Sequence, residues 1–177
     1  MPIVKIPKDR IAILIGKDGV TKQEIKARTG ARLEVDSESG DVEIDTRKVF
    51  EPVLALIVEE MVKAIGRGFS PEKAFRLLQD DVFLKVIDMR EYVGKNTSQV
   101  VRLRSRLIGS SGKTREKIEH QTGADISIQG NTVAIIGEIY ELDVACSAVD
   151  MILNGAEHSQ VYKFLDNKRK FIQMKRL

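Results

Sequence analysis

The sequence has no tryptophan, a single cysteine and only two histidines, and these absences limit the chemistry it can carry. Cys146 has no partner for an intrachain disulfide, so the fold must depend on its hydrophobic core, and we expect a reduced, buried thiol. His120 and His158 have no cysteine or histidine at zinc-ligand spacing and no nucleophile to activate. We therefore predict surface helix positions for both histidines, no metal, no cofactor, no catalytic residues and no enzyme activity.

Long apolar runs are also absent. No segment approaches the ~20 residues that span a bilayer, and the first residues, MPIVKIPKDR, lack the apolar core of a secretory signal. With 42% hydrophobic and 31% charged residues, the composition predicts a folded cytoplasmic protein without a membrane partner. Aromatic residues make up only 5%, so ring stacking is not expected to be the main way of holding nucleobases.

A 21-residue pattern occurs twice, as IGKDGVTKQEIKARTGARLEV at residues 15–35 and as IGSSGKTREKIEHQTGADISI at residues 108–128. Eight aligned positions are identical at an offset of 93, mostly glycines and apolar residues, as a duplicated structural unit predicts. In each copy a GxxG sequence precedes a charged helical pattern, which ends at Thr-Gly before an alternating strand. Residues 16–19 are called the first loop and residues 109–112 the second loop.

Around both loops the pattern predicts the order strand, helix, GxxG, helix, strand, strand, helix. In the first copy these elements are residues 2–6, 8–14, 21–28, 31–35, 42–44 and 50–65; in the second they are 82–89, 100–107, 114–120, 124–128, 132–136 and 138–153. A short helix beginning at Ser70-Pro71 connects the copies, and a last helix covers 157–176.

This order resembles the type I KH domain, and the resemblance covers nearly the whole chain. It implies an α+β fold of tandem KH domains, each a three-stranded antiparallel sheet with three helices on one face, plus a C-terminal helix. The expected divisions are 1–68 (first KH domain), 69–81 (helical linker), 82–157 (second KH domain) and 158–177 (basic C-terminal helix). KH domains bind about four nucleotides of single-stranded RNA, with the GxxG loop against the backbone.

Basic residues gather beside both loops. Residues 1–35 contain eight Lys or Arg against four acids, and residues 102–117 contain six against Glu116, whereas 36–60 hold eight acids against Arg47 and Lys48. This segregation predicts that a polyanion binds one face. Residues 158–177 carry six Lys or Arg against Asp166. That helix could dock on its own domain, or its basic stripe could touch RNA.

The residue types at the loops fit a phosphate backbone. Glycine lets a phosphate approach the main chain, the following helix adds its positive N-terminal end, and nearby isoleucines would form both core and groove floor. The predicted RNA-binding residues of the second copy are Arg102, Arg106, Ile108, Gly109, Ser110, Ser111, Gly112, Lys113, Arg115, Ile118 and Ile126; those of the first are Ile15, Gly16, Lys17, Asp18, Gly19, Lys22 and Ile25.

The two copies are not expected to bind equally. Asp18 puts a carboxylate beside the expected phosphate, whereas Ser110 and Ser111 are small and neutral. Repulsion at ~4–5 Å costs on the order of 1–4 kcal/mol, which Lys17 offsets in part. The second copy is therefore predicted to bind RNA more tightly.

Parts of the sequence also resemble proteins of two other functional classes. Gly112-Lys113-Thr114 is similar to the end of a nucleotide-binding P-loop, but Leu107 stands where that motif requires glycine, and the preceding stretch predicts a helix. A protein-binding scaffold, or a different KH regulator in which one repeat contacts a protein, stays open because of the acidic segment 36–60 and the weaker first loop.

The linker GRGFSPEKAFRLLQDD, the tandem loops and the basic tail together resemble one family: the two-KH-domain pre-ribosomal RNA processing factor of archaea and eukaryotes, of the partner-of-Nob-one type. The resemblance implies binding near the 3′ end of 16S rRNA during small-subunit assembly, beside an endonuclease or methyltransferase. Eukaryotic members have generally lost the first GxxG. Gly16 and Gly19 are present here, which indicates an archaeal version.

Overall fold

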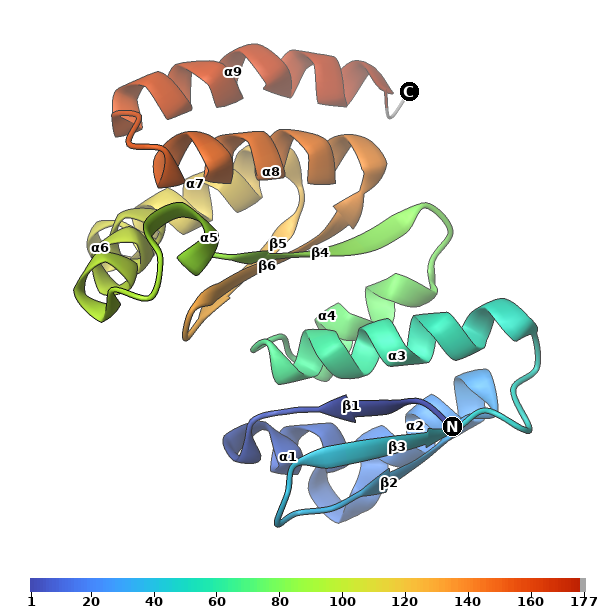
Figure 1. Ribbon diagram of the computed structural model, residues 1–177. Helices are drawn as coiled ribbons and strands as arrows, with labels where there is room; N and C mark the ends of the chain where they lie inside the picture. Colours follow the sequence, from blue (N-terminus) through green and yellow to red (C-terminus); the bar gives the residue numbers. More distant parts are fainter. Residues whose placement is uncertain (176–177) are drawn as a thin grey trace. The chain divides into compact units, whose positions relative to one another are not determined.

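The computed structural model describes residues 1–175 and contains two compact units, Met1–Asp80 and Asp81–Leu177 (Figure 1). Arg176 and Leu177, the end of the predicted C-terminal helix, lie outside the described residues. Each unit contains a three-stranded antiparallel sheet with helices packed on it, which confirms the predicted α+β fold.

The first unit follows the predicted order. Its strand order is β1-β3-β2, and the register sets Val4 opposite Val42 and Leu33 opposite Ile44. These four side chains are buried because alternate residues of a strand point to the same face. The elements are β1 (Ile3–Lys5), α1 (Lys8–Ile15), η1 (Lys17–Gly19), α2 (Val20–Thr29), β2 (Arg32–Val35), β3 (Asp41–Asp45) and α3 (Pro52–Gly66).

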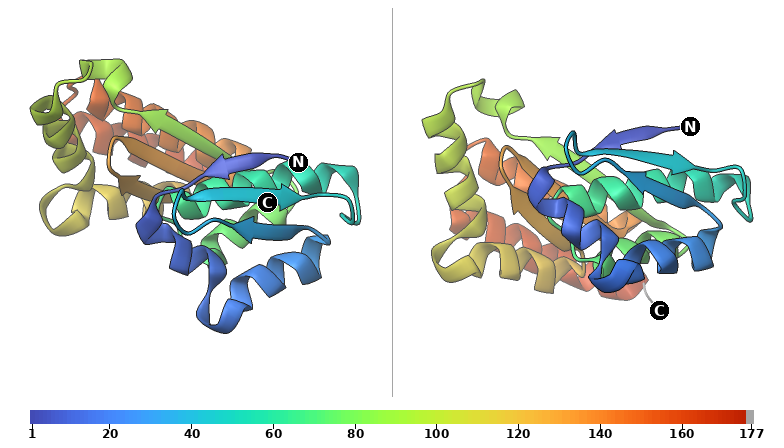
Figure 2. Two further views of the ribbon diagram at one scale, coloured as in Figure 1. Left: turned by 60° about the horizontal axis from the view of Figure 1, so that its bottom comes forward. Right: turned by 90° about the horizontal axis from the view of Figure 1, so that it is seen from below.

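Helices α1 and α2 meet at the first loop, beside the sheet (Figure 2). Gly30 ends α2 in the left-handed conformation, at a φ of 83°, as predicted for a C-terminal glycine cap. The segment after α3 folds as α4 (Pro71–Ala74) and η2 (Phe75–Leu78), and both pack against α3. The Ser70 side chain accepts a hydrogen bond from the Lys73 amide at 3.4 Å, which confirms the predicted helix start.

The second unit repeats this plan with strand order β4-β6-β5. The short helix α5 was not predicted; it follows a turn in which Asp88 accepts a hydrogen bond from the Arg90 amide at 2.9 Å. The elements are β4 (Val82–Asp88), α5 (Arg90–Val93), α6 (Thr97–Ile108), η3 (Ser110–Gly112), α7 (Lys113–Thr122), β5 (Asp125–Gln129), β6 (Thr132–Glu138), α8 (Ile139–Leu153) and α9 (His158–Lys175).

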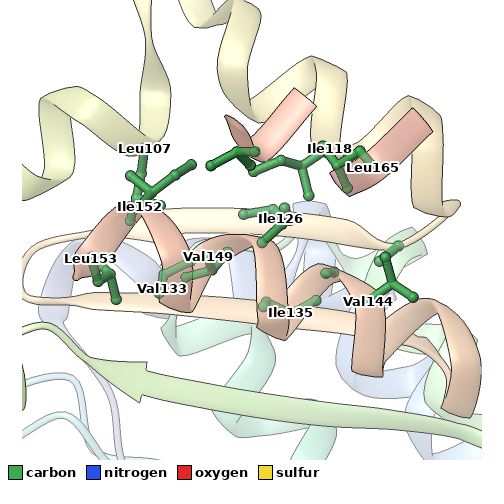
Figure 3. Close-up of a cluster of buried hydrophobic side chains, with 14 of the residues drawn as sticks. Leu107, Ile118, Ile126, Val133, Ile135, Val144, Val149, Ile152, Leu153 and Leu165 are labelled. Atoms are coloured by element: carbon green, nitrogen blue, oxygen red, sulfur yellow. The ribbon is translucent and has the colours of Figure 1, made fainter. Parts of the chain in front are cut away.

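A continuous apolar core joins every layer of the second unit (Figure 3). Ile126 and Ile135 of the sheet meet Ile118 of α7 and Val149 of α8, and all four are buried. Helix α9 lies outside α8 and contacts both α7 and α8 (Figure 1). It contributes Val161, Leu165 and Ile172 to the same core. Each such side chain stabilises the fold by about 1.5–3 kcal/mol, so α9 is an integral part of this unit.

Candidate nucleic-acid interface

The second loop has a glycine with positive φ at each end. Gly109 adopts φ 74° and ψ 175°, and Gly112 adopts φ 78° and ψ 9°. Between them Ser111 lies at φ 55° and ψ 28°, a left-handed conformation that is uncommon outside glycine. The first loop reproduces this geometry, with Gly16 at φ 78° and ψ 168° and Asp18 at φ 54° and ψ 27°. The repeated sequence therefore encodes a repeated backbone shape.

The first glycine of each loop packs against a threonine of the helix that follows. A Cβ on Gly109 would overlap Thr114 Oγ1 and lie 2.8 Å from the Thr114 nitrogen. A Cβ on Gly16 would meet Thr21 in the same way, 2.7 Å from its nitrogen. Both threonines are buried. Gly109 and Gly16 are thus needed for close packing within the loop.

The second glycine of each loop has room for a side chain instead, with open space at Gly19 and a single neighbouring carboxylate at Gly112. The nearest atom to a Cβ on Gly112 would be Glu116 Oε1 at 3.9 Å, and nothing lies within 4 Å of a Cβ on Gly19. Gly112 also immediately precedes α7, whose N-terminal end has no side-chain cap. Unpaired amides and the helix dipole make such an end attractive to an anion. A phosphate would meet no side chain at position 112.

The predicted basic residues of the second copy occupy different environments. Lys113 is exposed at the first position of α7. Arg102 is exposed, and its Nε donates to Gln99 Oε1 at 2.9 Å. Arg115 donates to Glu119 Oε1 at 2.9 Å, and that same oxygen accepts the Ile126 amide at 3.2 Å. Lys113 and Arg102 are thus the more available cations, whereas the charge of Arg115 is partly neutralised.

The Arg106 side chain is hydrogen-bonded to main-chain oxygens at the end of another helix. Its guanidinium donates to the main-chain oxygens of Ile152, at 2.7 Å, and Ala156, at 2.5 Å. Ile152 lies in the last turn of α8, where helix carbonyls lack partners within the helix, and Ala156 lies just beyond the end of α8. A contact between Arg106 and RNA would compete with this role in capping α8.

Sequence reasoning missed a similar arginine in the first unit. Arg10 Nε donates to the Ile65 oxygen at 2.8 Å, and its Nη2 donates to the Phe69 oxygen at 2.7 Å, at the end of α3. Burial lowers the pKa of Arg10, and the nearby Asp9 carboxylate opposes that shift. No local pattern marks either arginine, because the carbonyls they bind are more than 45 residues away.

The predicted isoleucines divide into two groups. Ile15 and Ile108 end α1 and α6 beside the loops and are partly exposed. Ile25, Ile118 and Ile126 are 0%, 1% and 3% exposed, so the structure places them in the core. They support the wall of a groove from within and offer almost no surface to a base in this conformation.

Other predicted residues of the first copy lie at the surface. Lys17 and Asp18 are exposed in the first loop, and Lys22 is half-buried in the first turn of α2. The structure therefore brings a lysine and a carboxylate together at the first loop, whereas Ser110 and Ser111 leave the second loop neutral and exposed.

Three further residues lie near the second loop and were not among the predicted site residues. Arg104 Nη1 donates to the Gly130 oxygen at 3.1 Å, which links α6 to the turn between β5 and β6. His158 Nε2 lies 2.9 Å from the Arg106 oxygen, and the Tyr162 hydroxyl lies 3.0 Å from Thr114 Oγ1. His158 is half-buried, so its prediction as a surface residue was only partly right, whereas His120 is exposed.

Nothing in residues 1–175 forms a metal-binding group of three or more His, Cys, Asp or Glu side chains. Cys146 is half-buried, and burial raises the pKa of its thiol, which disfavours the reactive thiolate. Within the same range, no helix is both long and apolar enough to cross a membrane.

The fold and the paired GxxG loops define a tandem KH-domain protein of the RNA-binding class. The KH domain model matches residues 3–50, and the model for the second KH domain of PNO1, described as a eukaryotic type KH-domain (KH-domain type I), matches residues 83–170. The chain belongs to the archaeal PNO1-like family, also called Dim2, as the sequence resemblance predicted. The match to residues 83–170 includes most of α9.

Relatives match almost the whole chain. It is 44% identical, over 98% of its own length and 76% of the relative's, to a KH domain-containing protein of Methanocaldococcus jannaschii. The crystal structure of Dim2p from Pyrococcus horikoshii is similar at a TM-score of 0.86 and 43% identity, covering 94% of this chain and 98% of that one. The a/eIF2alpha–aDim2p–rRNA complex from the same organism contains a chain with a TM-score of 0.89 and 43% identity, covering 96% and 94%.

Proposed function

We propose that the protein binds single-stranded RNA through the second loop and acts in small-subunit ribosome assembly, near the 3′ end of 16S rRNA. The observation that carries the proposal is the room beside Gly112 at the start of α7, where no side chain caps the helix and the nearest atom to a Cβ would be Glu116 Oε1 at 3.9 Å. Ser110 and Ser111 are exposed there beside Lys113, so within the loop a phosphate meets small neutral groups and a neighbouring cation, with Glu116 as the nearby carboxylate. The groove beside the loop then holds the bases.

The similarity to a chain solved in complex with rRNA supports a ribosomal RNA as the ligand. An endonuclease or a methyltransferase of 16S rRNA maturation is the partner we propose on the family resemblance, and the cytoplasm is the proposed location. No cofactor is needed, because holding RNA requires charge and shape and no bond making.

A protein-binding role for the first unit is the second candidate. A pocket of about 340 Å³ lies beside the first loop and is lined by Val20, Thr21 and Phe75 among others. Val20 is 55% exposed directly after Gly19, and Asp18 disfavours a phosphate at the same loop. A recess with both apolar and charged lining, beside a loop that carries a carboxylate, suits a protein better than RNA. A factor resembling the a/eIF2alpha of the similar complex is a candidate partner.

The test is a binding titration of the full chain with fluorescein-labelled oligonucleotides. One oligonucleotide carries the last twelve or so nucleotides of 16S rRNA, a second has the same composition in scrambled order, and the third is the first annealed to its complement. We expect the single strand to bind more tightly than the duplex. Equal affinity for single strand and duplex would contradict the KH mechanism, and equal affinity for both single strands would contradict the 16S assignment.

A paired set of variants identifies the loop. Ser110→Asp with Ser111→Asp adds two negative charges to the second loop, and Lys17→Asp adds one and removes a positive charge at the first. The double aspartate variant should lose most of the affinity, while Lys17→Asp should change it little. The opposite ranking would assign RNA to the first loop.

A further inference from the structure

Helix α9 holds both helices that flank the second loop. At its first residue, His158 Nε2 lies 2.9 Å from the main-chain oxygen of Arg106, in the last turn of α6. One turn later, the Tyr162 hydroxyl lies 3.0 Å from Thr114 Oγ1, in the first turn of α7. Two side chains of one helix thus link the two sides of a loop that is 45 or more residues away in sequence.

The contact of Tyr162 extends to the loop itself. Thr114 is 3% exposed and is the residue against which Gly109 packs, with no room for a Cβ between them. A change in the position of the Thr114 side chain must therefore be accommodated by the loop backbone. Tyr162, Thr114 and Gly109 form one packed series from α9 to the first glycine of the second loop.

Further contacts fix α7 along α9. Lys117 Nζ lies 5.7 Å from the centre of the Tyr162 ring and 3.7 Å from Asp166 Oδ1, and the Gln121 side-chain amide donates to that oxygen at 3.1 Å. Thr114, Lys117 and Gln121 are spaced by three and four residues, so they share one face of α7. Asp166 consequently turns its charge toward α7.

The first unit has different contacts at the position that corresponds to Thr114. Thr21 corresponds to Thr114 in the repeat, and it lines the pocket of about 340 Å³ together with Phe75. Arg28, which corresponds to Gln121, lies over the Phe75 ring at 4.7 Å from its centre. The short helices α4 and η2 therefore leave an opening next to Thr21, where α9 places Tyr162 next to Thr114.

We propose that α9 sets the conformation of the second loop, and that Tyr162 is a positioning residue for RNA binding that does not itself touch RNA. This inference rests on the proposed function. It assigns the C-terminal helix a role distinct from direct contact through its exposed cations, Lys163, Lys168, Arg169 and Lys170. The helix strengthens the clamp by holding Thr114, and thereby Gly109, in place.

The test compares Tyr162→Phe with Tyr140→Phe. The first change removes the hydroxyl that meets Thr114; the second makes the same change at a ring that is 44% exposed and packs edge-to-face on Phe171. We expect Tyr162→Phe to weaken RNA binding two- to tenfold, the range for one neutral hydrogen bond, and Tyr140→Phe to leave it unchanged. The dependence of affinity on salt should stay at the wild-type slope, because no phosphate contact is lost.

A second readout reports on the loop in the absence of RNA. The amide NMR signals of Ser110, Ser111 and Gly112 should shift in Tyr162→Phe and stay in place in Tyr140→Phe. A variant Thr114→Val removes the same contact from the other side. Because both changes break one interaction, the double variant should lose little more affinity than either single variant.

Each outcome separates the possibilities. Wild-type affinity and unmoved loop signals in Tyr162→Phe would overturn the inference while leaving the proposed function intact. If Lys163→Gln with Lys170→Gln lowers the salt slope and Tyr162→Phe has no effect, α9 acts as a phosphate contact and the inference is wrong. If the wild-type protein fails to bind single-stranded RNA, the proposed function fails, and the inference that Tyr162 positions a site for RNA fails with it, whatever the loop signals show.

Discussion

Gly109 and Thr114 are packed so closely that a Cβ at position 109 would lie 2.8 Å from the Thr114 nitrogen. Gly112, at the other end of the same loop, has room for a Cβ, whose nearest neighbour would be Glu116 Oε1 at 3.9 Å. The two glycines of one GxxG sequence therefore have different physical roles: one preserves the packing of the loop and the other keeps its surface clear.

This difference predicts opposite results for two alanine variants. Gly109→Ala must strain a backbone region that is almost exclusive to glycine and also clash with Thr114, so it should lower the free energy of unfolding by about 2–3 kcal/mol. Gly112→Ala should cost only about 1 kcal/mol, since alanine tolerates the left-handed helical region better, yet it should weaken RNA binding strongly. Urea unfolding and RNA titration of both variants measure these effects. Equal loss of stability in the two would contradict the assignment.

Charge at the left-handed position of each loop should control affinity. Ser111 and Asp18 occupy the same backbone conformation, at φ 55° and 54°. Ser111→Asp should reduce affinity for the 16S-derived single strand at least about fivefold, because a carboxylate near a phosphate costs about 1–4 kcal/mol. Asp18→Ser is the matched control and should leave affinity the same or slightly higher. A large gain on Asp18→Ser would show that the first loop also binds RNA in the full chain.

Arg106 should matter more for stability than for RNA contact. Arg106→Gln leaves the Ile152 and Ala156 carbonyls without the guanidinium, and hydrogen bonds to charged groups contribute about 1.5–3 kcal/mol each when well shielded. Because the site is only partly buried, we expect a total loss of about 2 kcal/mol in urea unfolding.

Arg102→Gln is the control for this experiment, since Arg102 is exposed and its Nε donates to the side chain of Gln99 one turn earlier on the same helix. Its stability should change by less than about 0.5 kcal/mol. If Arg102 contacts a phosphate, its variant should instead reduce the slope of log affinity against log salt by about one. An Arg106→Gln protein with wild-type stability would contradict the capping role.

Tyr92 provides a pH-dependent prediction. Burial, together with the 2.7 Å hydrogen bond to Asp150, raises the pKa of Tyr92 to about 12. The unfolded chain ionises its tyrosines near pH 10, so this contribution to stability is complete below about pH 10 and is lost as the pH rises to about 12. The difference in unfolding free energy between wild type and Tyr92→Phe should therefore shrink over this interval. A constant difference from pH 9 to 12 would contradict the assignment.

The loops were predictable from sequence because their requirements are local. Gly16, Gly19, Gly109 and Gly112 all have positive φ, a conformation that glycine adopts at little cost, and both Thr-Gly sequences end a helix as expected. The order of helices and strands was predictable for the same reason, because the hydrophobic period and the glycines that end helices are local features. Helix α5 was not predicted because its four residues are too few to show a helical period in the sequence.

The contacts of Arg106, Ile118 and Tyr162 could not be predicted from local sequence patterns. A positively charged residue beside a GxxG sequence looks like a phosphate ligand, yet the fold brings the end of α8 to Arg106. An isoleucine next to a loop looks like groove lining, yet Ile118 is 1% exposed. In both cases the partner lies on another element, which only the tertiary arrangement identifies.

By itself, the sequence determined the duplication, the two glycine-bounded loops and the KH order of elements, because backbone conformation and hydrophobic period depend on neighbouring residues. The tertiary structure decided which cations remain available and how the C-terminal helix is used. Val161, Leu165 and Ile172 bury α9 on its own unit, and this packing carries Tyr162 to Thr114. Such contacts depend on the packing of distant segments, and that packing follows from the burial of apolar surface.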